Sequence, residues 1–300
     1  MHADEVTVDL ATAKVLITEQ FPRWAHLEVT PVGGTGTVNT IYRIGDTLTA
    51  RFPRQRTDLA TARRAVRLEA AALVEFEGVC PVAAPRPVAI GHPAAGYPMP
   101  WLVQTWVPGD VATPTSVADS AGIAFDLADL IQTLRRTPVK GRTFRGRGSG
   151  GNLGDHDTWV AHCLTQTDPL MDTGEMRQLW EYFRDLPPSR PHLMTHSDLT
   201  PFNLIVDRDR LAGVLAAGWF GPADPALDLV CAWHLFDHPA RTVFRGALQS
   251  SPVEWARGAA WAFIQAIGLV WYYRTTNPAM AALGETTLHR LLTAPGIHPA

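Results

Sequence analysis

Cysteine is scarce in this sequence. Only Cys80, Cys163 and Cys231 occur among 300 residues, and they are far apart and odd in number. Zinc sites and disulfide frameworks need closely spaced or paired cysteines, so this pattern argues against both. We therefore expect a chain that works in the reducing cytoplasm.

Strong net charge and long apolar runs are also lacking. Twenty-six basic and 29 acidic side chains give a formal charge of −3, which argues against nucleic acid or an anionic membrane as a partner. The longest apolar run, residues 261–273, contains Gln265 and is too short to span a bilayer, so we expect a buried helix. The first ten residues are polar and lack the apolar core of a signal peptide, which agrees with a cytoplasmic location.

The pattern of apolar residues divides the chain into two parts. Strands and two helices alternate up to a break at Pro108 and Gly109, and long helical segments dominate afterwards. We expect helices at 10–21 and 57–76 and strands at 27–32, 37–44, 47–52, 87–90 and 101–107 in the first part. The sequence thus predicts an α+β fold with a small antiparallel-sheet lobe (residues 1–107) and a larger, mostly helical lobe (residues 108–300).

One polar motif lies between two short apolar strands. The run HSDLTPFN places Asp198 and Asn203 five residues apart. This spacing suits proton abstraction from a hydroxyl by the aspartate and metal coordination by the asparagine. A polar hairpin, in which both side chains only satisfy local backbone groups, is the alternative.

Further groups precede this motif in an informative order. Gly34 and Gly36 belong to a glycine-rich turn, Arg51 lies on the second strand after it, and Glu69 lies on the following helix. Backbone N–H groups of a glycine turn can approach phosphates, although an ordinary β-turn explains these glycines equally well. A phosphate cover, a cation, a base and a metal ligand are the parts that phosphoryl transfer from ATP needs.

With these parts in this order, the chain resembles the aminoglycoside phosphotransferase family, small-molecule kinases with a protein-kinase-like bilobal fold. The stretches that carry the resemblance are HSDLTPFN, GVLAAGWFGPADPALDLV, NTIYRIGDTLTARFPR and WLVQTWVPGD. The resemblance implies transfer of the γ-phosphate of ATP, or GTP, to a hydroxyl of a small, antibiotic-type molecule with the help of Mg²⁺. Such an activity would confer antibiotic resistance.

The resemblance also implies roles for individual residues. Asp198 would be the catalytic base, Asn203 would hold magnesium, and His196 would brace their loop. Arg51 would contact the phosphates, oriented by Glu69.

Four more positions receive roles from the same resemblance. Gln104 and Trp106 would border the adenine. Asp224 and Asp228 would cap and anchor the helix beneath the site, with Asp228 also a candidate contact to substrate.

Three positions depart from the family pattern. Arg51 replaces a lysine found in many members, which is tolerable because arginine is a permanent cation that matches phosphate. Ala216 stands where the metal-binding aspartate is expected, and Trp219 stands where a small residue is expected. Loss of the carboxylate should lower metal affinity, and a bulky Trp219 would occlude the phosphates, so we expect the phosphotransferase activity to be impaired or lost. Residues 216–218 also read simply as the end of a buried strand.

These departures motivate a second hypothesis, a non-catalytic, pseudokinase-like protein that binds a ligand or partner in the old cleft. Different chemistry in the same cleft is a third.

The C-terminal helices, which form the acceptor pocket in this family, carry little negative charge. Between residues 231 and 284 the acids are Asp237 and Glu254, against four arginines and many aromatics. Trp271 and Tyr272 are candidates to line the pocket. The balance predicts a neutral or anionic acceptor, such as a macrolide or nucleoside-type antibiotic, rather than a polycation. The arginine-rich loop 142–147 reads either as an anion clamp or as a solvated surface loop.

Overall fold

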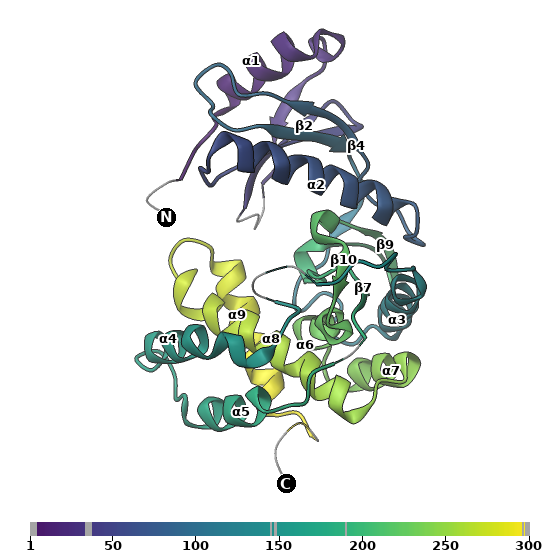
Figure 1. Cartoon of the computed structure of the whole chain (residues 1–300), viewed down its shortest axis with the longest axis vertical. Coiled ribbons are helices and arrows are strands. Elements are labelled where there is room, and N and C mark those ends of the chain that lie inside the picture. Colours follow the sequence, from purple (N-terminus) through teal and green to yellow (C-terminus); the bar gives the residue numbers. More distant parts are fainter. Residues whose placement is uncertain are drawn as a thin grey trace. The chain divides into compact units, whose positions relative to one another are not determined.

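The computed structural model describes residues 5–33, 38–144, 146, 149–189, 191–295 and 297. It divides into two compact units, which we describe separately (Figure 1). Unit 1 comprises residues Met1–Gly78, Ala83–Pro108 and Leu215–Gly218, and unit 2 comprises Val79–Val82, Gly109–Val214 and Trp219–Ala300. Unit 1 thus includes a short segment, Leu215–Gly218, that comes from far along the chain.

Unit 1 is built on an antiparallel sheet of five strands in the order β1-β2-β3-β5-β4. The strands are β1 (Val29–Pro31), β2 (Asn39–Ile44), β3 (Leu48–Pro53), β4 (Pro87–Gly91) and β5 (Trp101–Thr105). A hairpin turn at Gly45 joins β2 to β3, and Ile44 pairs with Leu48 across it. Gly45 has a φ of +53°, a conformation that glycine adopts without steric cost.

Two helices cover this sheet, α1 (Leu10–Gln20) and α2 (Leu59–Glu77). Successive side chains of β3 point to opposite faces of the sheet. Phe52 is fully buried in the core to which α1 contributes Leu16 and Ile17. The neighbouring Arg51 points the other way and forms an ion pair with Glu69 of α2. The sheet therefore presents an apolar face to α1 and a polar face to the middle of α2.

Unit 2 is mostly helical, with two small sheets. Its helices are α3 (Ala121–Arg136), α4 (Asp157–Thr167), α5 (Gly174–Arg184), α6 (Val230–Leu235), α7 (His238–Leu248), α8 (Pro252–Tyr272) and α9 (Pro278–Leu292). Strands β6 (Asp110–Val111), β8 (Leu204–Asp207) and β9 (Arg210–Val214) form one sheet, and β7 (Leu193–Thr195) pairs with β10 (Gly221–Ala223). The α+β class with a small antiparallel sheet and a helical C-terminal part is confirmed.

The longest apolar run lies in α8, which is buried along most of its length, as expected for a core helix. Within the described residues, we find no helix with both the length and the apolarity to cross a membrane. Local structure sets where two of the helices of unit 2 begin. α3 begins at Ala121 because the Ser120 hydroxyl accepts a hydrogen bond from the N–H of Ile123. α6 is preceded directly by a 3-10 turn, Pro225–Leu229.

A buried polar network ties α6, α8 and α9 together. His234 Nδ1 lies 2.9 Å from Thr287 Oγ1, and His234 Nε2 lies 2.9 Å from Gln265 Oε1. Because the amide oxygen can only accept, Nε2 carries the proton and Nδ1 accepts from the hydroxyl of Thr287. The neutral imidazole therefore satisfies both contacts, and burial disfavours its charged form.

This geometry predicts acid sensitivity. Burial lowers the pKa of His234 from 6.5 to about 4. Between these values the unfolded chain binds a proton that the folded chain does not, so the free energy of unfolding falls as the pH drops. A difference of one pKa unit corresponds to about 1.4 kcal/mol. We therefore expect the wild-type chain to lose about 3 kcal/mol of its free energy of unfolding between neutral and acidic pH through His234, and we expect His234→Gln to abolish this loss. Urea unfolding between pH 7 and 4 measures it. His162→Gln, at an exposed histidine of the same unit, should keep the wild-type profile, and equal slopes for both variants would contradict the prediction.

Candidate functional site

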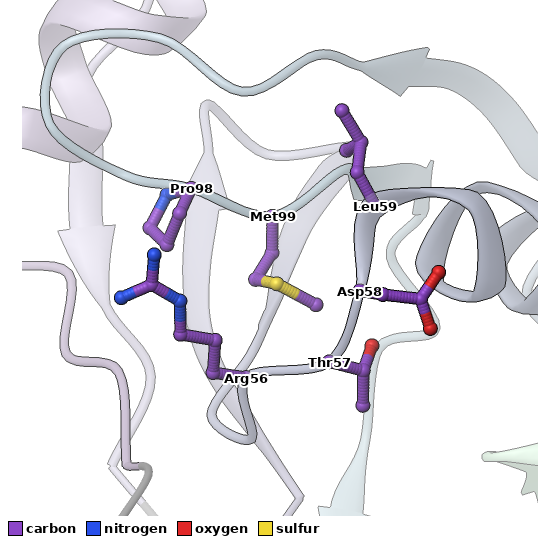
Figure 2. A pocket seen from close by; sticks show the side chains of 6 residues that line it. All are labelled: Arg56, Thr57, Asp58, Leu59, Pro98 and Met99. Atoms are coloured by element: carbon purple, nitrogen blue, oxygen red, sulfur yellow. The ribbon is translucent and has the colours of Figure 1, made fainter.

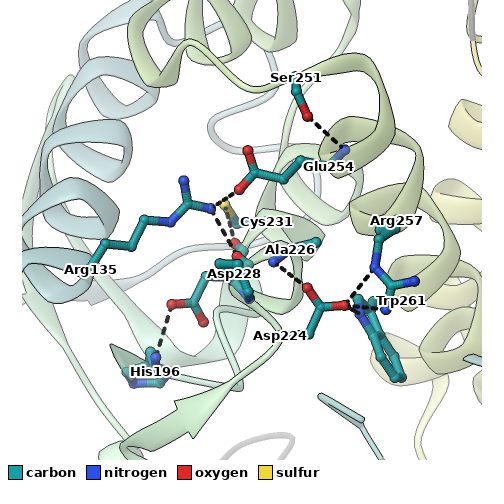
Figure 3. Close-up of polar contacts among 11 residues, drawn as sticks. Arg135, His196, Asp224, Ala226, Asp228, Cys231, Ser251, Glu254, Arg257 and Trp261 are labelled. Atoms are coloured by element: carbon teal, nitrogen blue, oxygen red, sulfur yellow. Dashed lines mark hydrogen bonds and ion pairs between the residues drawn. The ribbon is translucent and has the colours of Figure 1, made fainter. Parts of the chain in front are cut away.

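The HSDLTPFN motif forms the loop between β7 and β8, and the carboxylate of Asp228 holds this loop by hydrogen bonds to its backbone. Asp228 Oδ2 accepts from the N–H of His196 at 2.9 Å (Figure 3), and Oδ1 accepts from the N–H of Ser197 at 2.8 Å. Asp228 is fully buried, and burial raises its pKa to about 6. Because backbone N–H groups bind both of its oxygens, the geometry favours an anchoring role for Asp228 over a contact with substrate.

The loop backbone is unusual at Ser197, whose φ is +74°. A residue other than glycine pays a steric cost of about 1 kcal/mol in this left-handed region. The bond to Asp228 and a 2.9 Å contact between the hydroxyls of Ser197 and Thr195 hold it there. Ser197 directly precedes Asp198. The hydrogen bonds that hold Ser197 therefore also fix the position from which the Asp198 side chain projects.

Asp198, His196 and Asn203 come together as the sequence predicted. The N–H of Asp198 donates to His196 Nδ1 at 3.2 Å. The amide nitrogen of Asn203 donates to the main-chain oxygen of Asp198 at 2.9 Å and to its Oδ2 at 2.7 Å. Burial raises the pKa of Asp198, and the hydrogen bond from Asn203 offsets part of that rise. A carboxylate fixed in this way can accept a proton from a hydroxyl placed against its other oxygen.

In unit 1, the structure joins three of the predicted nucleotide-binding residues. Arg51 Nη1 lies 2.7 Å from Glu69 Oε1 and donates to Gln104 Oε1 at 3.4 Å. Gln104 is buried, and the side chain of Arg51 is 13% exposed. The guanidinium is thus oriented by a carboxylate and an amide, and it remains a permanent cation.

Trp106 lies on the same face of the sheet, but it contacts a different cation. The Arg43 guanidinium sits 5.0 Å from the centre of the Trp106 ring, and Arg43 pairs with Asp46 at the hairpin. Sequence reasoning missed Arg43. The period-2 alternation of β2 and β3 could have placed Arg43 and Arg51 on one face.

The segment Leu215–Gly218 lies against α2. A Cβ added at Gly218 would come within 2.7 Å of Glu69 Cγ, so the Glu69 side chain crosses the backbone there. Ala216 has a φ of +58°. Trp219, which follows this segment in sequence, belongs to unit 2 and is 81% exposed.

Asp224 is the centre of a second buried network in unit 2. Its Oδ2 accepts from Arg257 Nε at 2.9 Å, from Arg257 Nη2 at 2.6 Å and from Trp261 Nε1 at 2.8 Å. Its Oδ1 caps the following turn by accepting from the N–H of Ala226 (Figure 3), which confirms the predicted N-cap. The network fixes the loop that carries Asp228 onto α8.

The candidate acceptor residues lie at the end of α8. The rings of Trp271 and Tyr272 pack 5.6 Å apart, and His162 of α4 packs 5.3 Å from Trp271. Trp159, one turn earlier on α4, is exposed and continues this set of rings. We name these four residues the aromatic surface. Sequence reasoning did not single out His162 or Trp159 as acceptor contacts.

Some predicted positions cannot be located. Gly34 and Gly36 lie outside the described residues, as do Arg145 and Arg147 of the arginine-rich loop. A hollow at the start of α2 is lined by Arg56, Thr57, Asp58, Leu59, Pro98 and Met99 (Figure 2). It includes none of the predicted nucleotide-binding residues, so we do not place the candidate site there.

The donor set offers little to a divalent metal. Across the described part of the chain, no group of three or more His, Cys, Asp or Glu side chains could hold an ion. Asn203 uses its amide nitrogen on Asp198 and keeps one neutral oxygen, and Ala216 supplies no oxygen from its side chain. Magnesium prefers hard oxygen ligands that include carboxylates, so the residues present do not fit it.

Comparison with known proteins agrees with this architecture. The sequence profile of the "Phosphotransferase enzyme family" matches residues 28–261. Among curated proteins, no sequence matches the chain. The solved structure of APH(2")-IIia with GDP and kanamycin superposes with a TM-score of 0.70 at 18% identity, covering 93% of this chain and 97% of that one.

Two further structures align over similar lengths. The GDP complex of wild-type aminoglycoside 2'-phosphotransferase-IIIa gives a TM-score of 0.69 at 16% identity, covering 95% and 99% of the two chains. The apoenzyme of macrolide 2'-phosphotransferase MphH from Brachybacterium faecium gives 0.61 at 17% identity, again covering 95% and 99%. At these identities the likeness establishes the fold. The match to the family profile covers more than half of the sequence and includes Arg51, Asp198 and Asp228, and on that ground the chain belongs to the phosphotransferase enzyme family.

Proposed function

We propose that the chain is an antibiotic-type O-phosphotransferase that moves the γ-phosphate of ATP or GTP to a hydroxyl of a small molecule. The observation that carries this proposal is the fixed carboxylate of Asp198, which Asn203 and His196 hold and Asp228 anchors. The neighbours crystallised with GDP or ADP support a nucleotide as the donor.

Each side chain has a defined task in the proposed reaction. Asp198 accepts the proton of the acceptor hydroxyl as that oxygen attacks the γ-phosphorus, and the bond from this phosphorus to the bridging oxygen breaks so that the nucleoside diphosphate leaves. Arg51, oriented by Glu69, stabilises the negative charge of the phosphates, and Gln104 and Trp106 border the base. Positioning and charge stabilisation account for most of the rate enhancement in this reaction class. None of these tasks involves magnesium, because the residues present do not fit this ion.

The aromatic surface supports an acceptor with apolar faces. Small-molecule sites are lined mainly by aromatic and apolar side chains, with few polar groups to fix orientation. Neighbours of the same fold were solved with kanamycin, gentamicin and streptomycin. These polycations run against our expectation of a neutral or anionic acceptor, so we propose only a hydroxyl-bearing, antibiotic-type molecule.

The test is a panel of acceptors. Purified protein is incubated with ATP or GTP and with kanamycin, gentamicin, streptomycin or a macrolide, and nucleoside diphosphate release and phosphorylated product are measured. Turnover of at least one acceptor above the level of Asp198→Asn supports the proposal. Turnover no higher than that variant, with every acceptor and both nucleotides, would contradict it.

Ala216 supports a second candidate, a non-catalytic ligand- or partner-binding protein. In that case a ligand should raise the melting temperature without turnover, because a ligand that binds only the native state stabilises it.

A further inference from the structure

The residues of unit 1 to which we assign phosphate binding differ in charge from the pattern that we expect of the family. Arg51 and Glu69 form an ion pair of 2.7 Å, which orients the guanidinium. Ala216, on the segment that Glu69 crosses, adds a methyl group where a carboxylate is expected. Arg51, Glu69 and Ala216 all belong to unit 1, so this arrangement does not depend on how the two units are placed.

A triphosphate is strongly anionic, and a carboxylate beside it is tolerated only if a cation intervenes. In a site with an aspartate at this position, the divalent metal both bridges the phosphates and neutralises that aspartate. Here alanine replaces the aspartate, so no carboxylate at this position repels the phosphates and no metal is needed to screen that repulsion. The reason to recruit a metal for binding is correspondingly weak.

Arg51 can supply the positive charge instead. Its guanidinium carries five N–H donors in a fixed fork and is not deprotonated in proteins. Glu69 and Gln104 orient it, and Glu69 is in turn confined by the backbone at Gly218. A fixed guanidinium loses little freedom when it binds phosphate.

We propose that this chain binds a nucleoside triphosphate without a divalent metal, with Arg51 as the counter-charge and Ala216 as the residue that makes the metal dispensable for binding. The inference rests on the nucleotide part of the proposed function. It concerns binding and makes no claim about the transfer step.

Isothermal titration of ATP and GTP, with EDTA or with Mg²⁺, tests the inference. For the wild-type chain we expect dissociation constants within about threefold of each other in the two buffers. Ala216→Asp should bind about tenfold or more weakly in EDTA and recover with Mg²⁺, because it restores the carboxylate. The left-handed backbone at residue 216 accepts Asp and Asn readily, so both substitutions are compatible with folding.

Ala216→Asn is the matched control, because asparagine has the shape of aspartate without its charge. It should keep metal-free binding, whereas Arg51→Gln should lose it. Wild-type binding that EDTA weakens by about tenfold or more would overturn the inference, as would no binding in either buffer, or Ala216→Asn behaving like Ala216→Asp.

The acceptor panel reports separately on the proposed function. Metal-free binding without turnover would overturn the proposed function and uphold this inference. Turnover combined with metal-dependent nucleotide binding would uphold the proposed function and overturn this inference.

Discussion

Replacing Asp198 with asparagine should lower kcat for acceptor phosphorylation by about 10²–10⁴-fold, the range that a positioned general base contributes. The substitution keeps the shape of the side chain and removes its capacity to take a proton. The backbone N–H of residue 198 still donates to His196 Nδ1, and the loop is still anchored by Asp228. We therefore expect the fold and the nucleotide affinity to be retained while turnover is lost.

Initial rates with saturating nucleotide and acceptor, together with nucleotide titration, measure both effects. The control is Asp207→Asn, at an exposed carboxylate at the end of β8, which should leave kcat unchanged. The pH profile gives a second readout. The pKa of Asp198 is raised by burial, so kcat/KM should fall with decreasing pH before an ordinary aspartate would protonate. Wild-type kcat in the Asp198→Asn variant would rule out this residue as the base.

Asp224→Asn should lower the free energy of unfolding of unit 2 by about 3–5 kcal/mol, the usual cost of breaking a buried ion pair from one side. The side chains of Asp224 and Arg257 are each 1% exposed. An amide in place of the carboxylate leaves the Arg257 guanidinium without its counter-charge and weakens the bond from Trp261 Nε1. The desolvated cation then has little water to compensate it.

Urea unfolding followed by circular dichroism measures the loss. Asp168→Asn makes the same substitution in a pair with Arg177 whose side chains are 47% and 44% exposed, and it should cost less than about 1 kcal/mol. A similar small loss for both variants would show that the buried network contributes no more than a surface pair.

The sequence was sufficient for the fold class and for the local geometry of the HSDLTPFN loop. Asp198 and Asn203 are near in sequence and are held between two short strands, so spacing alone brings them together. The pair of Arg51 and Glu69 was also predictable, because the order of strand and helix left few arrangements. In both cases short connections limit the possible geometry.

Partners from distant segments were not predictable. Arg257 lies 33 residues after Asp224, and an arginine inside an apolar helix gives no sign of which carboxylate it meets. The left-handed backbone at Ala216 was equally hidden, because alanine carries no preference for that conformation. The contact of Arg43 with Trp106 depended on strand register, which a single sequence does not specify.

The segment Leu215–Gly218 has a consequence for how the chain is made. Unit 1 includes this segment, whereas its remaining residues end at Pro108. A ribosome must add 110 more residues (218 − 108) before the segment exists. Protein synthesis proceeds at about 5–20 residues per second, so residues 215–218 become available roughly 5–20 s after the rest of unit 1. During that interval Glu69 lacks the backbone that it later crosses. Expression of residues 1–108 alone would therefore yield an incomplete unit, and a dissected nucleotide-binding fragment needs residues 215–218 restored.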